Sequence, residues 1–161
     1  SMALSSWLTA NGLPAENVHN LNATTNHQMG QLNREADVAL FPNRAEGGTN
    51  LVAMECLACG IPTILSANTG HLDLIDSDRC YPLHRQGPVT AQGEFIGVEG
   101  WGESDVDEVL ELLERVYCDR TEAQQKGVAA AHFMQDLTWE KQIRHLCQLL
   151  QESDLYKHLQ V

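Results

Sequence analysis

The sequence has little positive charge, which limits the partners that it can bind. Its 161 residues include 10 lysines and arginines against 22 aspartates and glutamates, for a formal net charge of −12. A nucleic-acid groove needs clustered basic side chains to neutralise a run of phosphates, so we predict no nucleic-acid partner. A single nucleotide is not excluded, because backbone N–H groups at the start of a helix can bind one anion without a basic patch.

The sequence also lacks long apolar runs and a leader peptide. No run approaches the roughly 18 residues of a membrane span. No charged segment followed by an apolar one opens the chain. We therefore expect a cytoplasmic protein, and we leave open a peripheral position at a membrane.

Cysteines are few and scattered, which argues against a disulfide framework. The five are Cys56, Cys59, Cys80, Cys118 and Cys147. Cys56 and Cys59 form a C-x-x-C, but a structural zinc needs two further ligands, and the seven histidines show no H-E-x-x-H or paired-ligand spacing. We expect no metal site and no cofactor. We interpret both thiols as small packed hydrophobic groups, and a redox pair at an exposed helix start is the alternative.

From about residue 18 to residue 83, short apolar runs alternate with helical patterns, which predicts β-α-β units and a parallel sheet. The expected strands are 37–41 and 63–65, with weaker ones at 18–21 and 80–83. Met29, Leu32 and Ala36 recur at helical spacing before the strand at 37–41. The expected fold class is therefore α/β, with a sheet of about four strands.

The rest of the chain divides into a loop and a helical region. Residues 84–102 carry five glycines and one proline with no sustained period, which predicts a long loop. Amphipathic patterns then predict three helices, with Ser104, Thr121 and Thr138 at their starts.

The sharpest turn of the first half follows the strand at 37–41. Residues 42–50 contain Gly47 and Gly48, and apolar residues from Leu51 onward predict a short helix that ends at Gly60. Two glycines permit a close backbone approach, and the helix start offers unpaired N–H groups with about half a positive charge. Ligands of open α/β sheets bind beyond the carboxyl ends of strands, where this loop lies. The loop is a candidate anion cradle, and an ordinary strand-to-helix turn is the alternative.

The order of features in ADVALFPNRAEGGTNLVAMECLACGIPTILSANTGHLDLI, residues 36–75, is specific. It resembles the C-terminal, donor-binding domain of GT-B retaining glycosyltransferases, especially the group that includes family 4. That family pattern ends in Glu-Ala-x-Ala-x-Gly-x-Pro, which stands here as residues 55–62. The resemblance implies a Rossmann-like parallel sheet. Residues 1–103 would form the nucleotide-sugar-binding core, including the loop 84–103, and residues 104–161 would be C-terminal helices that pack on the same domain.

The resemblance also implies roles for two glutamates. Glu55 matches the second glutamate of the family's E-x7-E motif, which receives the ribose hydroxyls of a sugar nucleotide. A carboxylate suits this task because it accepts two hydrogen bonds from a diol. Glu46 matches the first glutamate, the catalytic residue that meets the donor sugar. Eight residues separate the two here, not seven. Either Gly47 and Gly48 absorb a one-residue bulge, which we favour, or Gly47 fills the family position.

Further donor contacts are implied in the same loop and after the second strand. Backbone N–H groups, with the Thr and Asn side chains, would meet the sugar hydroxyls and the diphosphate at Gly47, Gly48, Thr49, Asn50 and Leu51. A plain helix cap is an equal alternative for Asn50. His71 either faces the same cleft as a donor-binding residue or is structural.

Three other residues stand out by their type. Arg44 could neutralise phosphate charge, but we favour an exposed loop arginine. We expect Trp101 and Trp139 to pack helices against the sheet, as large aromatic side chains usually do.

The sequence departs from the family pattern at its start. It begins near the family's third strand, so the resemblance implies truncation on the N-terminal side and a missing N-terminal acceptor domain. Arg34 is its first basic residue, so the Arg/Lys pair that neutralises the leaving diphosphate is absent. The missing strands lie in the family's sheet between 18–21 and 37–41. The fragment must close that gap, expose an edge, or pair with another copy in a homo-oligomer.

The resemblance implies transfer of a sugar from a nucleotide-diphosphate donor to an unknown acceptor, with retention at the anomeric carbon. The intact enzyme would be a glycosyltransferase of the hexosyltransferase type, active in carbohydrate biosynthesis. We predict that this chain alone is inactive or nearly so, because the cations that would stabilise the leaving diphosphate are missing. A non-catalytic nucleotide-sugar-binding module and a protein-interaction module are the alternatives, and a nucleotide-sugar epimerase is a weaker one.

Overall fold

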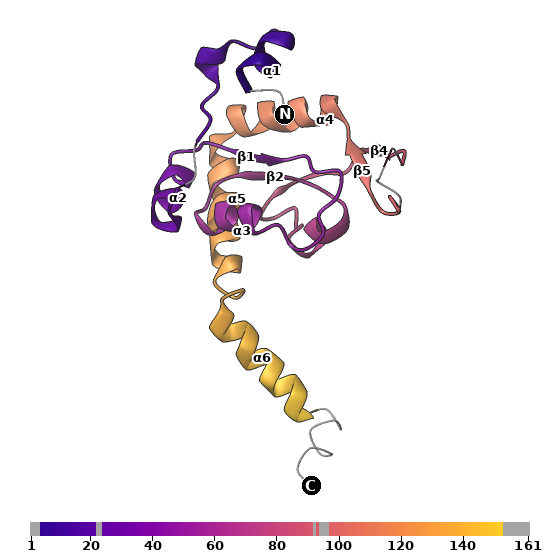
Figure 1. Cartoon of the computed structure of the whole chain (residues 1–161). Coiled ribbons are helices and arrows are strands. Elements are labelled where there is room, and N and C mark those ends of the chain that lie inside the picture. The colour runs from indigo at the N-terminus through magenta and orange to yellow at the C-terminus, as the bar shows by residue number, and fades with distance from the viewer. Residues whose placement is uncertain (1–3, 22–23, 92, 94–96, 153–161) are drawn as a thin grey trace.

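A computed structural model of the chain describes residues 4–21, 24–91, 93 and 97–152 (Figure 1). Two short 3-10 helices, η1 and η2, occur among its helices and strands. In chain order the elements are α1 (Leu4–Ala10), η1 (Ala15–Asn17), α2 (Asn26–Asn33), β1 (Ala39–Phe41), α3 (Leu51–Ala58), β2 (Thr63–Ser66), η2 (Thr69–Asp73), β3 (Tyr81–Leu83), β4 (Gln86–Pro88), β5 (Gly102–Ser104), α4 (Val106–Cys118), α5 (Arg120–Met134) and α6 (Trp139–Glu152).

The centre of the fold is a parallel sheet of β1, β2 and β3, in that order. Leu40 lies opposite Ile64, and Ile64 lies opposite Tyr81. All four residues of the central strand β2 are buried. Parallel strands are buried in this way because helices cover both faces of the sheet.

Successive side chains of β2 point to opposite faces of the sheet and divide the core in two. Leu65 packs on one face with Leu57 of α3 and Ala130 of α5. Ile64 packs on the other face with Val116 of α4. In Figure 1 α4 lies above the sheet and α3 lies below it. The expected α/β class with a Rossmann-like parallel sheet is therefore confirmed.

The strands differ from the expectation in two places. The segment 18–21 is not a strand, and its side chains Val18 and Leu21 are exposed, so it has no apolar face to bury against the sheet. The parallel sheet therefore has three strands in the described residues, where about four were expected. The segment 84–102 is not wholly a loop, because β4 pairs with β5 in antiparallel fashion, with Gly87 opposite Glu103. Strands of three residues are too short to show a period of two in the sequence.

Two of the three expected helix starts are displaced. Ser104 lies in β5, where its hydroxyl accepts a hydrogen bond from a side-chain amide of β4 at 3.1 Å. Asp105 caps α4 instead and accepts the amide of the third helical residue at 2.8 Å. Asp119 caps α5 in the same way, in place of Thr121. Thr138 precedes α6, as predicted. Aspartate caps as well as serine or threonine, so the tertiary position selects among neighbouring candidates.

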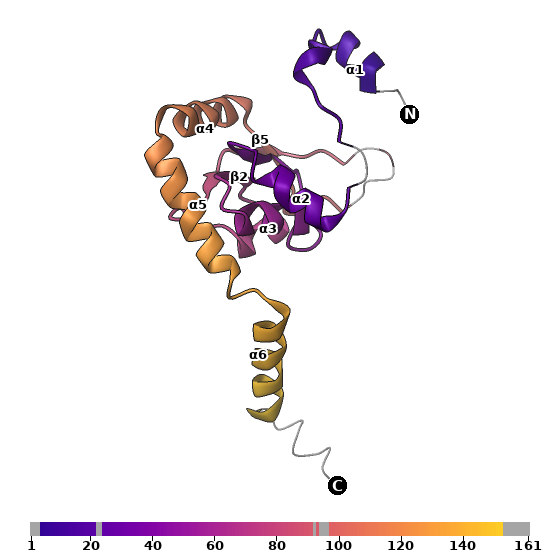
Figure 2. The same ribbon diagram turned by 90° about the vertical axis from the view of Figure 1, so that its left-hand side faces the viewer.

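The last helix stands apart from the sheet. α4 and α5 pack on the sheet, whereas α6 extends away from it in both views (Figures 1 and 2). None of its residues is buried. Trp139 is 85% exposed, so the expectation that it packs a helix against the sheet is wrong.

The sheet ends at β1 on one side. Among the described residues β1 pairs with β2 alone, and Leu40 at its centre is exposed. The chain thus exposes an edge, which is one of the three outcomes expected for the missing strands. In the part of the chain that the structure describes, no helix is long and apolar enough to cross a membrane.

Candidate functional site

The loop of residues 42–50 joins β1 to α3 at the carboxyl end of the sheet. Asn50 caps α3: its side-chain oxygen accepts from Ala53 N at 3.1 Å, and its backbone is left-handed, with φ 56°. An N-cap of this kind satisfies only some of the N–H groups in the first turn. The amides of Leu51 and Val52 have no partner within the helix, so they can bind an anion or a hydroxyl oxygen.

The cap is held in place by a buried histidine. Asn50 Nδ2 lies 2.8 Å from His71 Nε2. An amide NH₂ only donates, so Nε2 is the acceptor and the ring proton is on Nδ1. Nδ1 lies 3.1 Å from the carbonyl oxygen of Ser66, to which it donates. Both ring nitrogens of His71 therefore have partners within the protein.

Burial favours the neutral form of this histidine. The side chain of His71 is completely buried. Burial lowers its pKa below the ordinary value, although the Ser66 carbonyl and the Glu46 carboxylate act in the opposite direction. The neutral ring is also the form that accepts from Asn50, so the hydrogen bonds and the burial agree.

Besides the contact between Asn50 and His71, the end of β2 and the segment that follows it support the loop through four hydrogen bonds. Ser66 Oγ donates to Asn43 O at 2.7 Å, and Asn68 Nδ2 donates to the same oxygen at 3.0 Å. Glu46 N donates to Thr69 Oγ1 at 2.7 Å, and Gly70 N donates to Glu46 O at 3.2 Å. The backbone of the loop is thus fixed on both sides of Glu46.

Three glycines have different roles in this contact. A Cβ on Gly70 would overlap the carbonyl oxygen of Gly48, so only glycine fits against the loop there. A Cβ on Gly47 or on Gly48 would meet no atom within 4 Å. The packing of the chain itself does not require these two glycines, and they leave open space in front of the loop.

The two predicted glutamates lie in different surroundings. Glu46 is partly buried, and its Oε2 accepts from Asn43 Nδ2 at 3.3 Å. Glu55 is exposed on α3, on the same face as Leu51 and Ala58, which are four residues before it and three after it. The opposite face of α3 is buried in the core. Glu55 therefore points to the side of α3 that a ligand can reach.

The structure brings most of the predicted residues together. Residues 46–50 lie in one loop, and the buried side chain of His71 contacts this loop at Asn50. Arg44 is exposed and forms an ion pair with Glu103 of β5. The sequence reasoning missed Ser66, Asn68 and Thr69. A signal was present, because Ser66 ends β2 and the other two residues follow it, and the carboxyl ends of adjacent parallel strands meet at one edge of the sheet.

The C-x-x-C lies at the C-terminal end of α3. Cys56 is buried in α3, and burial raises the pKa of its thiol to about 11, with smaller contributions from Cys59 and Glu55. The thiol is protonated at neutral pH, which agrees with a packing role and not with a reactive thiolate. Among the described residues, no three His, Cys, Asp or Glu side chains are placed to hold a metal ion.

A family model described as family 4 glycosyltransferase in conflict systems matches residues 7–146. The chain belongs to this family. No match was found among curated proteins. The match covers α3, the loop before it and the segment after β2, so the glycosyltransferase resemblance of residues 36–75 is confirmed at the level of the family.

Solved structures have the same fold as this family 4 glycosyltransferase chain. Sucrose-phosphate synthase from Thermosynechococcus elongatus aligns with a TM-score of 0.70 and 20% identity, over 92% of this chain and 33% of that protein. Anabaena Alr3699/HepE, solved in complex with UDP, aligns with a TM-score of 0.63 and 18% identity, over 91% of this chain and 36% of that protein. The chain thus spans about a third of the length of these relatives.

Proposed function

We propose that this chain is the donor-binding part of a glycosyltransferase that transfers a sugar from a nucleotide-diphosphate sugar to an acceptor with retention. Residues 1–103 form the donor-binding core in this proposal, and residues 104–161 form the accompanying helices. The observation that carries the proposal is the loop before α3. Its backbone is fixed by Thr69 and Gly70, yet open space lies in front of Gly47 and Gly48.

The proposed donor contacts follow from this arrangement. The amides of Gly48, Thr49 and Leu51 would donate to the diphosphate and the sugar hydroxyls, because a preorganised row of N–H groups stabilises negative charge without reorganisation. Glu55 would accept the ribose hydroxyls from its exposed position on α3. Glu46 would meet the donor sugar as the catalytic carboxylate.

We propose that Asn50 and His71 support the donor site together. The Asn50 side chain caps α3 through its oxygen and donates one N–H to His71, so its second N–H and its backbone remain for a ligand. His71 would act through Asn50 as a positioning residue, since both of its ring nitrogens are bonded within the protein. A direct contact of His71 with the donor stays a prediction.

Sugar transfer builds negative charge on the leaving diphosphate, which N–H dipoles and cations must stabilise. The loop supplies the N–H dipoles. The cations would come from the first strands of the donor domain, which the family pattern places before this sequence, and the acceptor site would come from an N-terminal domain, because this chain spans only about a third of its structural relatives. We therefore propose that the isolated chain binds the donor without appreciable transfer, and that neither a metal nor a cofactor takes part.

Calorimetric titration of the chain with UDP-, GDP- and ADP-sugars tests donor binding. UDP is the first nucleotide to use, because Alr3699/HepE was solved with it. We expect saturable binding of at least one donor and at least tenfold weaker binding by Glu55→Ala. Glu140→Ala, which removes an exposed glutamate on α6, is the matched control and should bind as the wild type does.

Three outcomes would contradict the proposal. Failure of every nucleotide sugar to bind would remove the donor role. Equal binding by Glu55→Ala and wild type would contradict the role of Glu55 as the residue that accepts the ribose hydroxyls. Robust turnover by the isolated chain, measured as nucleotide release with a panel of saccharide acceptors, would contradict the need for a further domain.

A further inference from the structure

A cavity lies beside the candidate loop, where the β4-β5 pair meets it. Gly102 N donates to Arg44 O at 2.8 Å, which joins β5 to the loop. The cavity has a volume of about 440 Å³. This lies within the range of roughly 300–1,000 Å³ that is usual for small-molecule sites. Its walls include Arg44, Trp101 and Glu103 but none of the eight predicted donor-site residues.

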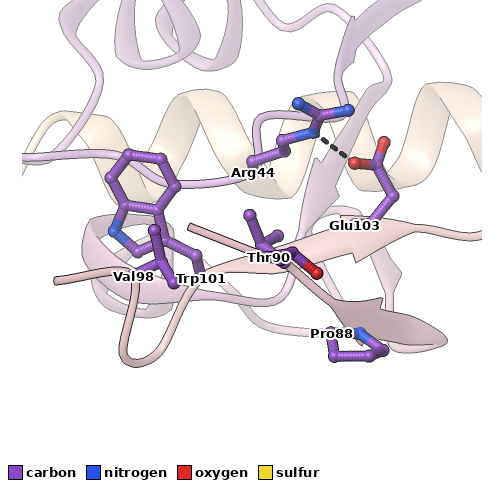
Figure 3. A pocket seen from close by; sticks show the side chains of 7 residues that line it. Arg44, Pro88, Thr90, Val98, Trp101 and Glu103 are labelled. Atoms are coloured by element: carbon purple, nitrogen blue, oxygen red, sulfur yellow. Dashed lines mark hydrogen bonds and ion pairs between the residues drawn. The ribbon is translucent and has the colours of Figure 1, made fainter. Parts of the chain in front are cut away.

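The walls of this cavity are of two kinds. Trp101, Val98 and Pro88 supply an apolar surface, and Trp101 N donates to Val98 O at 3.1 Å, which fixes the turn that carries the indole. Arg44 and Glu103 face each other as an ion pair (Figure 3). The cavity thus offers an aromatic surface and a charged pair to the same ligand.

The ion pair retains hydrogen-bonding capacity for a ligand. The side chains of Arg44 and Glu103 are 61% and 51% exposed. Arg44 uses only its Nε in this contact, so the remaining N–H groups of its guanidinium can donate to a ligand. Glu103 has a second carboxylate oxygen that can accept. Donors and acceptors side by side match hydroxyl groups, since each hydroxyl both donates and accepts.

Charge and polarity select among ligand classes. Glu103 neutralises Arg44, and the whole chain carries a formal charge of −12, so a phosphate or another anion is disfavoured. A purely apolar ligand would leave the ion pair buried without solvent, which costs free energy. A pyranose ring satisfies both walls. Its C–H face packs on the electron-rich face of the indole, and its hydroxyls reach the ion pair.

We propose that this cavity, the Trp101 pocket, binds a pyranose ring of a neutral saccharide. Trp101 is the stacking surface, and Arg44 and Glu103 bind the hydroxyls. Arg44 is two residues before Glu46 in the same loop, so a saccharide here lies near the place proposed for the donor sugar. Saccharide binding at this cavity does not depend on the proposed function.

Protein-observed NMR with ¹⁵N-labelled chain tests the proposal. The probes are the methyl glycosides of glucose, galactose, mannose and N-acetylglucosamine, and the disaccharides sucrose and maltose, without any nucleotide. The indole N–H signal of Trp101 is assigned from its loss in Trp101→Phe. We expect at least one saccharide to shift this signal in a saturable way.

Variants locate the binding site. Trp101→Ala and Glu103→Gln should each weaken the saccharide at least tenfold, while Trp101→Phe, which keeps an aromatic surface and guards against misfolding, should weaken it less. Trp139→Ala removes an exposed tryptophan on α6 and should have no effect. The proposal is overturned if no saccharide shifts the Trp101 signal, if Trp101→Ala binds as the wild type does, or if UDP shifts that signal and saccharides do not.

Glu55→Ala separates this proposal from the proposed function. If both are correct, this variant loses nucleotide-sugar binding and keeps saccharide binding at the Trp101 pocket. Saccharide binding in a chain that binds no nucleotide sugar would support the pocket and contradict only the donor role.

Discussion

Replacing Gly70 with alanine tests whether the loop of residues 42–50 is held against the segment after β2. The added Cβ would overlap the Gly48 carbonyl oxygen and would lie 2.7 Å from its carbonyl carbon and 3.0 Å from Glu46 O. Carbon atoms in contact normally stay about 3.5–4.0 Å apart, so one of the two segments must move by about 1 Å or more. The three atoms nearest to the added Cβ belong to the backbone, so rotation of a side chain cannot relieve the overlap with them.

This movement has a calculable cost. Overpacking of a well-packed site costs about 1–3 kcal/mol. The same shift stretches the bonds from Glu46 N to Thr69 Oγ1 and from Gly70 N to Glu46 O, each worth about 0.5–1.5 kcal/mol. We expect Gly70→Ala to lower the free energy of unfolding by about 2–4 kcal/mol. For a chain of this size the melting temperature should then fall by about 5–15 °C.

Gly48→Ala is the matched control, because it changes the partner of the same contact. A Cβ on Gly48 meets nothing within 4 Å, so its free energy of unfolding should stay within about 0.5 kcal/mol of the wild type. Urea unfolding followed by circular dichroism measures both variants. Equal stability of Gly70→Ala and wild type, or a larger loss in Gly48→Ala than in Gly70→Ala, would refute the described contact between the two segments.

Three further predictions concern buried groups in or beside α3. Burial lowers the pKa of His71, so stability should fall as the pH drops below about 6.5, where the unfolded chain takes up the proton. His71→Gln should show a smaller change in urea midpoint between pH 7 and pH 5, and equal changes would contradict this. Burial raises the pKa of the Cys56 thiol to about 11, so at pH 8 iodoacetamide should modify the exposed Cys147 before Cys56. Peptide mass spectrometry measures the labelling of each cysteine. Rapid labelling of Cys56 would contradict the prediction. A Cβ on Gly127 would overlap the carbonyl oxygen of Gly60, so Gly127→Ala should lower the free energy of unfolding in urea by about 1–3 kcal/mol. An unchanged urea midpoint would argue against this close approach of α5 to the end of α3.

Much of the loop could be predicted because its signals are local. The glycines at 47 and 48 and the apolar run from Leu51 mark a turn into a helix, and the structure has α3 begin at Leu51 with Asn50 as its cap. The block of residues 55–62 identified the glycosyltransferase family, which the family model then matched. The roles of individual residues in donor binding stay predictions.

The supporting residues could not be assigned in the same way. Ser66, Asn68 and Thr69 contact the loop across more than 20 residues of sequence. No spacing rule links residues so far apart, since the contact exists only when β1 and β2 lie side by side. The burial of His71 depends on the same packing, so its placement behind Asn50 could not be read from its neighbours in the chain.

The sequence by itself determined the α/β class, the position of the turn before α3 and the family, because alternating apolar runs, glycines and a contiguous motif act over short distances. Only the tertiary structure decided which aspartates cap α4 and α5, which glycine must remain a glycine, and how Arg44 meets Glu103, 59 residues further on. The physical reason is the same in each case. These features depend on which segments the folded sheet brings into contact. The local sequence allows several alternatives for each feature, and the packing of the folded chain selects one of them.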